Sequence, residues 1–249
     1  MTLANRVVLI TGGGTGLGRA IALTLAAEGA TVVVNYSRSR DDALQTVQDL
    51  ETLGARAVAI QADVSRPDEA RRLVRETLDA FGRINALVNN AARTAIVPMA
   101  DLDGMDDDEW DAIMGLNVKT PWVLARAASP ALRSERGCIL NVASISGLRP
   151  AGSSLAYCVS KAALLHLTRC LAVAMAPDVR VNAVAPGFMP TRWGRRFGDA
   201  ALEAIAAESA LERLVPTEDA ARVALELIRN ESITGETIVV DAGLTLGSS

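Results

Sequence analysis

The sequence predicts a doubly wound α/β fold, in which a mostly parallel sheet lies between two layers of helices (αβα), in a single domain over residues 1–249. Two observations predict it. Short apolar runs, such as residues 6–10 and 31–35, have the composition of strands that are buried on both faces. Longer segments with helical spacing of apolar residues separate these runs, without any linker, and such alternation is typical of parallel sheets with right-handed crossovers.

The expected elements follow one another in a regular order. The first unit is a strand over residues 6–10, a helix that ends at Gly29 and a strand over 31–35. Then come helix 41–53, strand 57–60, helix 67–81, strand 86–88, a long helix over about 107–132 that is bent near Pro121, and strand 138–142. The chain closes with a helix that begins near Ser154, strand 179–185, an irregular polar segment over about 190–200, helix 217–229 and strand 237–240.

The composition argues against several classes of function. The net charge is −4 and there is no basic block, so we expect no nucleic-acid partner. The N-terminus lacks a signal-peptide pattern and no apolar run looks long enough to span a bilayer, so we expect a cytoplasmic protein without a membrane partner. The cysteines have no CxxC spacing and His166 is the single histidine, so we expect no metal site. Any redox chemistry then needs a cofactor and a proton donor other than histidine.

A glycine-rich turn, from Thr11 to Gly18, lies between the first expected strand and its helix. Glycines let a ligand approach the backbone closely, and a helix N-terminus presents free N–H groups and the positive end of the helix dipole. Both features suit a pyrophosphate. Many glycine-rich turns are only tight turns, but the placement between strand and helix favours a dinucleotide site.

Tyr157 and Lys161 share one face of the helix that begins near Ser154. The chain has only two tyrosines and only two lysines, among many arginines, so a chance pairing at this spacing is uncommon. An ammonium near a phenol favours the phenolate, and this pair could therefore exchange a proton near neutral pH. The alternative is two unrelated residues on a solvated helix face.

Several motifs together resemble those of the short-chain dehydrogenase/reductase family, which has the Rossmann fold, and within it the 3-oxoacyl-carrier-protein reductases. The resemblance covers essentially the whole chain. The matching residues are Thr11, Gly12, Gly16 and Gly18 for Thr-Gly-x-x-x-Gly-x-Gly, residues 89–92 for Asn-Asn-Ala-Gly, Asn117, Ser144, Tyr157 with Lys161 for Tyr-x-x-x-Lys, and Pro186, Gly187 and Thr191 for Pro-Gly-x-x-x-Thr.

The resemblance implies hydride transfer between a nicotinamide cofactor and a substrate that is a ketone or a secondary alcohol. Tyr157 would be the acid or base, and Ser144 would hold the substrate oxygen. Lys161 would lower the pKa of Tyr157 and bind the nicotinamide ribose. Asn117 would bind a water in a proton relay; the alternative for Asn117 is a hydrogen bond at a helix kink.

Charge at the end of the second expected strand bears on the choice of cofactor. An acidic residue there would bind the adenosine 2′-hydroxyl and repel a 2′-phosphate, but this chain has Asn35 followed by Tyr36, Ser37 and Arg38. Hydroxyl and guanidinium groups suit a phosphate. We therefore expect NADP(H), with NAD(H) as the alternative, although NADP-using relatives often carry a basic residue where this chain has Thr15.

The other cofactor contacts implied by the resemblance lie at the carboxyl ends of the strands, where ligands bind in such sheets. Among them, Asp63 would bond the adenine amino group, with Val64 packing nearby. The full set is Gly12, Thr15, Gly16, Leu17, Gly18, Asn35, Ser37, Arg38, Asp63, Val64, Asn90, Ala91, Tyr157, Lys161, Pro186, Gly187 and Thr191.

The substrate is expected to be a small carbonyl or alcohol compound, with 3-oxoacyl thioesters among the candidates. It should contact the loop near residues 93–99 and a substrate-loop segment of about residues 188–215. Within that segment, Trp193 and Phe197 suggest an apolar lid, while Arg195 and Arg196 could meet an acidic group or only be solvated.

Some positions depart from the pattern of the family. Ala92 and Ala242 stand where glycine is common, and residues 174–178 lack the basic residue that carrier-protein reductases tend to have there. The resemblance also suggests a homotetramer. Two alternative functions stay open: an NAD(H)-dependent dehydrogenase of a sugar, polyol or steroid alcohol, and a dinucleotide-binding regulator without catalytic activity.

Overall fold

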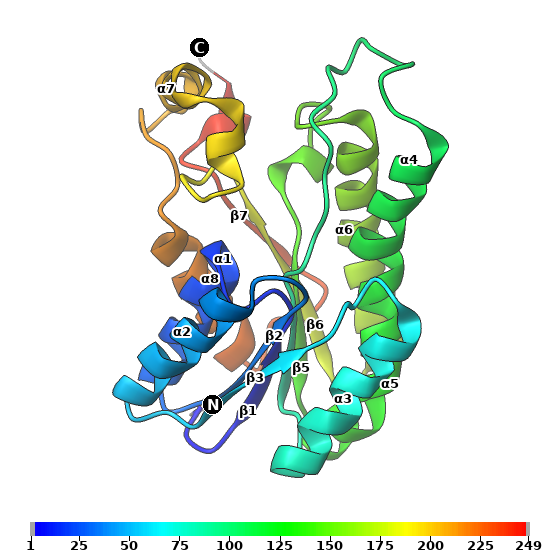
Figure 1. Cartoon of the computed structure of the whole chain (residues 1–249), viewed down its shortest axis with the longest axis vertical. Coiled ribbons are helices and arrows are strands. Elements are labelled where there is room, and N and C mark those ends of the chain that lie inside the picture. The colour runs from blue at the N-terminus through cyan, green and yellow to red at the C-terminus, as the bar shows by residue number, and fades with distance from the viewer. Residues whose placement is uncertain (1–2, 248–249) are drawn as a thin grey trace.

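The computed structural model describes residues 3–247, which form a seven-stranded sheet with helices on both sides (Figure 1). The order of its strands is β3-β2-β1-β4-β5-β6-β7, and all neighbouring strands are parallel. The winding therefore reverses between β1 and β4, as the doubly wound fold predicts. The strands are β1 (Val7–Ile10), β2 (Thr31–Tyr36), β3 (Ala57–Gln61), β4 (Ala86–Asn89), β5 (Cys138–Val142), β6 (Arg180–Pro186) and β7 (Thr237–Val240).

Helices form a layer on each face of the sheet (Figure 1). One layer contains α1 (Gly16–Ala27), α2 (Arg40–Thr52) and α8 (Thr217–Arg229). The other contains α3 (Pro67–Phe81), α4 (Asp107–Met114), α5 (Thr120–Ser134) and α6 (Leu155–Met175). Further helices lie in the segments that connect or follow these elements. They are η2 (Ile145–Gly147), η3 (Gly194–Phe197), α7 (Asp199–Glu208) and η4 (Leu244–Leu246).

The apolar strands are buried on both faces because each face packs against a helix layer. In β1, Val8 and Ile10 belong to the core cluster that includes residues of α1 and α8. Val7 and Leu9 belong to the cluster that includes residues of α3 and α5. Polar and apolar residues alternate along a strand only when one of its faces meets solvent. A strand with two buried faces therefore appears in the sequence as a continuous apolar run.

The expected long helix over residues 107–132 is interrupted. Between α4 and α5 lies a π-helical turn, η1 (Gly115–Lys119), in which the amide of Thr120 donates to the carbonyl of Gly115, five residues earlier. Pro121 explains the change, because it has no N–H to donate to the carbonyl of Asn117. The irregularity therefore precedes the proline and includes Asn117.

One further expectation was wrong. The segment expected to be irregular, about residues 190–200, contains η3 and the start of α7. Helix α6 has 21 residues and a mean hydropathy of 1.4 over its most apolar stretch. Length and composition alone would allow α6 to cross a membrane. In this fold it packs on β6, and it carries Lys161, which is 2% exposed.

Candidate active site

A cleft of about 970 Å³ crosses the carboxyl ends of the strands. It extends from the glycine-rich turn and Arg38 at one end to Ser144 and Tyr157 at the other. Every residue of the expected cofactor set lines this cleft except Gly18. Of the expected catalytic residues, Asn117 does not line it.

The glycine-rich turn needs its glycines for two reasons. Gly12 and Gly16 have φ angles of +61° and +52°, in the left-handed region that L-residues avoid. Gly18 is buried, and a Cβ on it would overlap the carbonyl oxygen of Gly12. Thr15, the N-cap of α1, makes no side-chain capping bond within residues 3–247, so the first turn of α1 keeps N–H groups for an anion.

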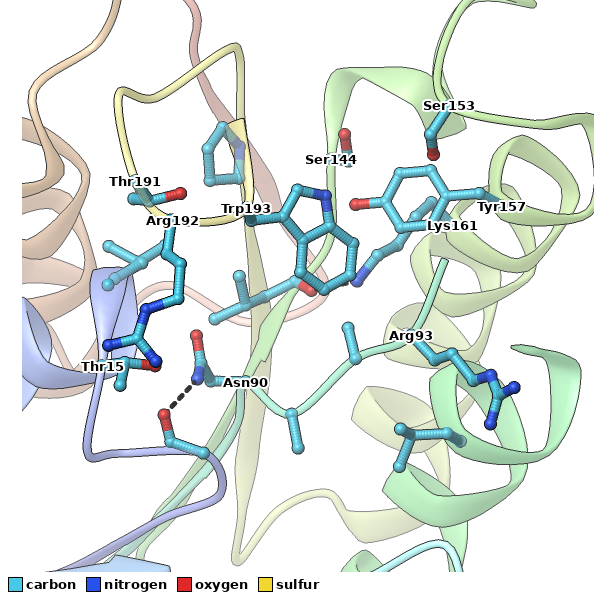
Figure 2. A pocket seen from close by; sticks show the side chains of 18 of the residues that line it. Thr15, Asn90, Arg93, Ser144, Ser153, Tyr157, Lys161, Thr191, Arg192 and Trp193 are labelled. Atoms are coloured by element: carbon cyan, nitrogen blue, oxygen red, sulfur yellow. Dashed lines mark hydrogen bonds between the residues drawn. The ribbon is translucent and has the colours of Figure 1, made fainter. Parts of the chain in front are cut away.

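Asn90, the residue that follows β4, holds this turn in place. Its side-chain amide donates to the carbonyls of Thr11 and Gly12, at 2.9 and 3.0 Å. Figure 2 draws one of these bonds as a dashed line. The main-chain amides of Asn90 and Ala91 both donate to the Thr11 hydroxyl, at 3.0 Å. The Asn-Asn-Ala element therefore contributes to the site by fixing the shape of the turn.

Asn35 lines the cleft, as expected, but its side chain bonds to the protein itself. It is 1% exposed. Its oxygen accepts from the amide of Gly12 at 3.4 Å, and its nitrogen donates to the carbonyl of Ala62 at 3.1 Å. Asn35 therefore joins the turn to β3, and the groups that remain for a phosphate at this end are the exposed Ser37 and Arg38.

Tyr157 and Lys161 are positioned by the first turns of α6. Ser154 caps the helix by accepting from the amide of Tyr157 at 3.3 Å. One turn later, Lys161 passes behind the Tyr157 ring, with Nζ 5.6 Å from the ring centroid, and donates to the carbonyl of Val142 at 2.8 Å. Ser144 follows β5, and Figure 2 shows it beside Tyr157 at the same end of the cleft.

The ionisation of this pair differs from the sequence expectation. Burial raises the pKa of Tyr157 to about 12, and a hydrogen bond with Ser144 opposes the shift only in part. Burial also lowers the pKa of Lys161 to about 7. Lys161 was expected to lower the pKa of Tyr157, but burial is the largest influence on that pKa, and the Nζ of Lys161 donates to the carbonyl of Val142. Tyr157 therefore keeps its proton at neutral pH.

Asn117 supports the site from behind the cleft. Its oxygen accepts from the amide of Arg93 at 2.9 Å, and its nitrogen donates to the carbonyl of Arg93 at 3.0 Å and to the Ser160 hydroxyl at 2.9 Å. These bonds fit the helix-kink alternative and engage the side-chain amide. The expected water relay would have to use the main-chain carbonyl of Asn117, which has no α-helical partner because residue 121 is proline.

Aromatic rings line the substrate end. Trp193 faces Tyr157, with ring centroids 6.1 Å apart, and Phe197 meets Phe188 edge-on at 5.2 Å (Figure 2 shows Trp193 and Tyr157). Arg195 and Arg196 are exposed and do not line the cleft.

Sequence reasoning missed two features of the cleft. Arg192 lines it and pairs with Asp42. Ser153 also lines it, and its hydroxyl lies 2.5 Å from that of Thr94. Both pairs join residues that are far apart in the chain, so no local pattern could have revealed them.

Comparison with known proteins adds three similarities over most of the chain. A family model described as "Enoyl-(Acyl carrier protein) reductase" matches residues 12–245. The chain is 43% identical over 243 residues to a protein named as ketoacyl reductase 2 of the granaticin polyketide synthase from Streptomyces violaceoruber, covering 96% of each chain. It is 34% identical over 244 residues to a 3-oxoacyl-[acyl-carrier-protein] reductase of Staphylococcus epidermidis, covering 96% of this chain and 99% of that one.

A solved structure is similar over the same range. It is a short-chain dehydrogenase from Burkholderia cenocepacia in complex with NADP, with a TM-score of 0.91 and 34% identity, covering 98% of this chain and 100% of that one.

Proposed function

The chain belongs to the short-chain dehydrogenase/reductase family, and from this premise we propose that it reduces a ketone to a secondary alcohol with NADPH. One observation carries the proposal: Ser144 and a protonated Tyr157 lie at one end of a cleft whose other end is a glycine-rich turn. A dinucleotide along the cleft would place its reactive ring near these hydroxyls.

The residues that line the cleft fit a nicotinamide dinucleotide. Gly12 and Gly16 leave room for close approach of a diphosphate, and the first turn of α1 offers N–H groups to it. Lys161 uses one of its N–H groups on Val142, which leaves others for the hydroxyls of a ribose. When bound, the cofactor supplies a hydride to the carbonyl carbon.

The protein then supplies the proton and the orientation. Tyr157 donates the proton on Oη to the carbonyl oxygen, and Ser144 holds that oxygen by a hydrogen bond. Burial raises the pKa of Tyr157, so the phenol holds its proton at the start of reduction. The same residue would take the proton back if the reaction ran toward the ketone. Trp193, whose ring centroid lies 6.1 Å from that of Tyr157, adds an apolar surface beside the reacting atoms.

We infer that the substrate is a 3-oxoacyl or related polyketide ketone. Phe188, Met189, Trp193 and Phe197 give the substrate end an aromatic and apolar wall. Such a wall suits a hydrophobic acyl chain or ring better than a sugar or polyol, whose hydroxyls would need polar partners. The names of the ketoacyl-reductase relatives agree with this choice. A cytoplasmic location and a homotetramer stay predictions.

Parallel fluorescence titrations with NADPH and NADH, followed by turnover assays, test the proposal. The assays would offer a 3-oxoacyl thioester, a cyclic aromatic ketone and an enoyl thioester, and would monitor oxidation of the bound cofactor. We expect tighter binding of NADPH and turnover of the two ketones only. Tighter NADH binding would instead support the alcohol dehydrogenase, and binding without any turnover would support the regulator.

A further inference from the structure

An ion pair joins the two walls of the cleft at the glycine-rich turn. Arg192, in the segment after β6, meets Asp42, in the first turn of α2, through two contacts of 3.1 and 3.2 Å between guanidinium and carboxylate. These residues are 150 positions apart in the chain. Arg192 lines the cleft, and Figure 2 shows its side chain extending from beside Thr191 toward Thr15.

Both partners are anchored next to the turn by close packing. A Cβ placed on Gly16 would lie 3.5 Å from the Thr191 methyl group, so the segment that carries Arg192 lies over the turn. A Cβ placed on Gly14 would lie 2.9 Å from the Cα of Ala43, so the turn of α2 that carries Asp42 lies against it. The guanidinium is therefore held at the adenosine end of the cleft.

At the adenosine end of the cleft, one arginine that is unpaired within residues 3–247 is available for a phosphate, and a second cation would strengthen the binding. Arg38 is exposed and its side chain has no partner among the described residues. The neighbouring Thr15 is neutral, and Asp42 contributes a negative charge that would repel a phosphate. A phosphate with nearly two negative charges binds best where guanidinium groups can donate in pairs.

We propose that Arg192 is a cofactor-specificity residue, which leaves Asp42 and binds the 2′-phosphate of NADP(H). The proposal rests on the proposed use of NADP(H). The exchange is feasible because the Arg192 and Asp42 side chains are 74% and 36% exposed, and ion pairs so exposed to solvent are weak. Asp42 lies in the first turn of α2, directly after the segment with Ser37 and Arg38, which lines the same cleft as Arg192. We therefore assign Arg192 to the 2′-phosphate rather than to the diphosphate.

Two variants, one at each partner of the ion pair, test whether Arg192 leaves Asp42 for the 2′-phosphate. Arg192→Met removes the guanidinium and leaves Asp42 unpaired, so we expect NADPH to bind about tenfold more weakly and NADH to change less than about twofold. Asp42→Asn releases Arg192 and removes a repelling charge, so we expect NADPH to bind about threefold more tightly, again with little change for NADH. Arg195→Met is the matched control, because Arg195 is an exposed arginine of the same segment outside the cleft, and it should change neither affinity.

The titrations separate failure of this inference from failure of the proposed cofactor. If the wild-type protein prefers NADPH and Arg192→Met keeps that preference, Arg192 does not read the 2′-phosphate, and the inference is overturned alone. Equal losses for both cofactors would place Arg192 on the diphosphate and also overturn it. If the wild-type protein prefers NADH, the proposed cofactor fails and this inference fails with it. A loss confined to NADPH in Arg192→Met, with a gain in Asp42→Asn, supports it.

Discussion

Replacing Lys161 by methionine should stabilise the protein at neutral pH and stabilise it less as the pH rises. Lys161 is 2% exposed, and burial lowers its pKa from 10.5 to about 7. Between these two pKa values the unfolded chain binds a proton that the folded chain does not. The stability of the wild-type protein therefore increases with pH across this window, and the cost of burying Lys161 is largest below it. Methionine has a similar length and no charge to bury.

The size of the effect follows from the shift in pKa. The cost of burying Lys161 is about 4 kcal/mol at pH 7 and about 1 kcal/mol near pH 9.5. Methionine also loses the hydrogen bond from Nζ to the carbonyl of Val142, which costs about 1–3 kcal/mol at either pH. The net gain at pH 7 is thus modest. The change in the gain between the two pH values, about 3 kcal/mol, does not depend on that bond.

Urea unfolding of both proteins at about pH 7 and about pH 9.5, at one protein concentration, measures this change. Lys119→Met is the control, because it replaces the other lysine of the chain, which is exposed, and should give the same small effect at both pH values. If the stability difference between Lys161→Met and the wild type were the same at both pH values, Lys161 would not carry the pKa shift, and the reasoning on burial at this site would be refuted.

Three further predictions concern single residues. Tyr157→Phe should lower kcat by about a thousandfold, because it removes the proton on Oη, while the Kd for NADPH stays within about twofold in a fluorescence titration; near-normal turnover would contradict the acid role. Arg38→Ala should weaken NADPH about tenfold and NADH little in the same titration, since Arg38 is an exposed cation that lines the adenosine end of the cleft; equal losses would count against a phosphate there. Ala242→Gly should stabilise the protein by about 0.5–1 kcal/mol, because Ala242 has a φ of +54°; thermal unfolding measures it, and a lower Tm would show that the strain is absent.

The sequence predicted elements well where their signals are local. Helix α3 has the bounds that were expected, because Pro67 begins it and Gly82, at a φ of +71°, ends it. The strands were found within about two residues because continuous apolar runs have few other uses in a chain of this composition. Helix α7 was missed, because the substrate-loop segment was treated as irregular.

The residues of the site were likewise predictable where their signals are local. Tyr157, Lys161 and the glycine-rich turn are recognised by short spacings, and the structure brings them to one cleft. The hydrogen bonds of the Asn35 side chain were not predictable, since they join it to Gly12 and Ala62, which lie on other parts of the chain. The side-chain bonds of Asn117 depend on Arg93 and Ser160, which lie on other parts of the chain.

By itself, the sequence determined the alternation of strands and helices, the family and the residues that can exchange a proton or cradle a phosphate. These features follow from backbone sterics and residue spacing, which act over a few positions. Only the tertiary structure decided that Tyr157 stays protonated, that Lys161 is close to losing its charge and that Arg192 meets Asp42 across the cleft. The loss of solvent around a side chain and the approach of distant charges depend on the whole packed molecule, and no local pattern encodes them.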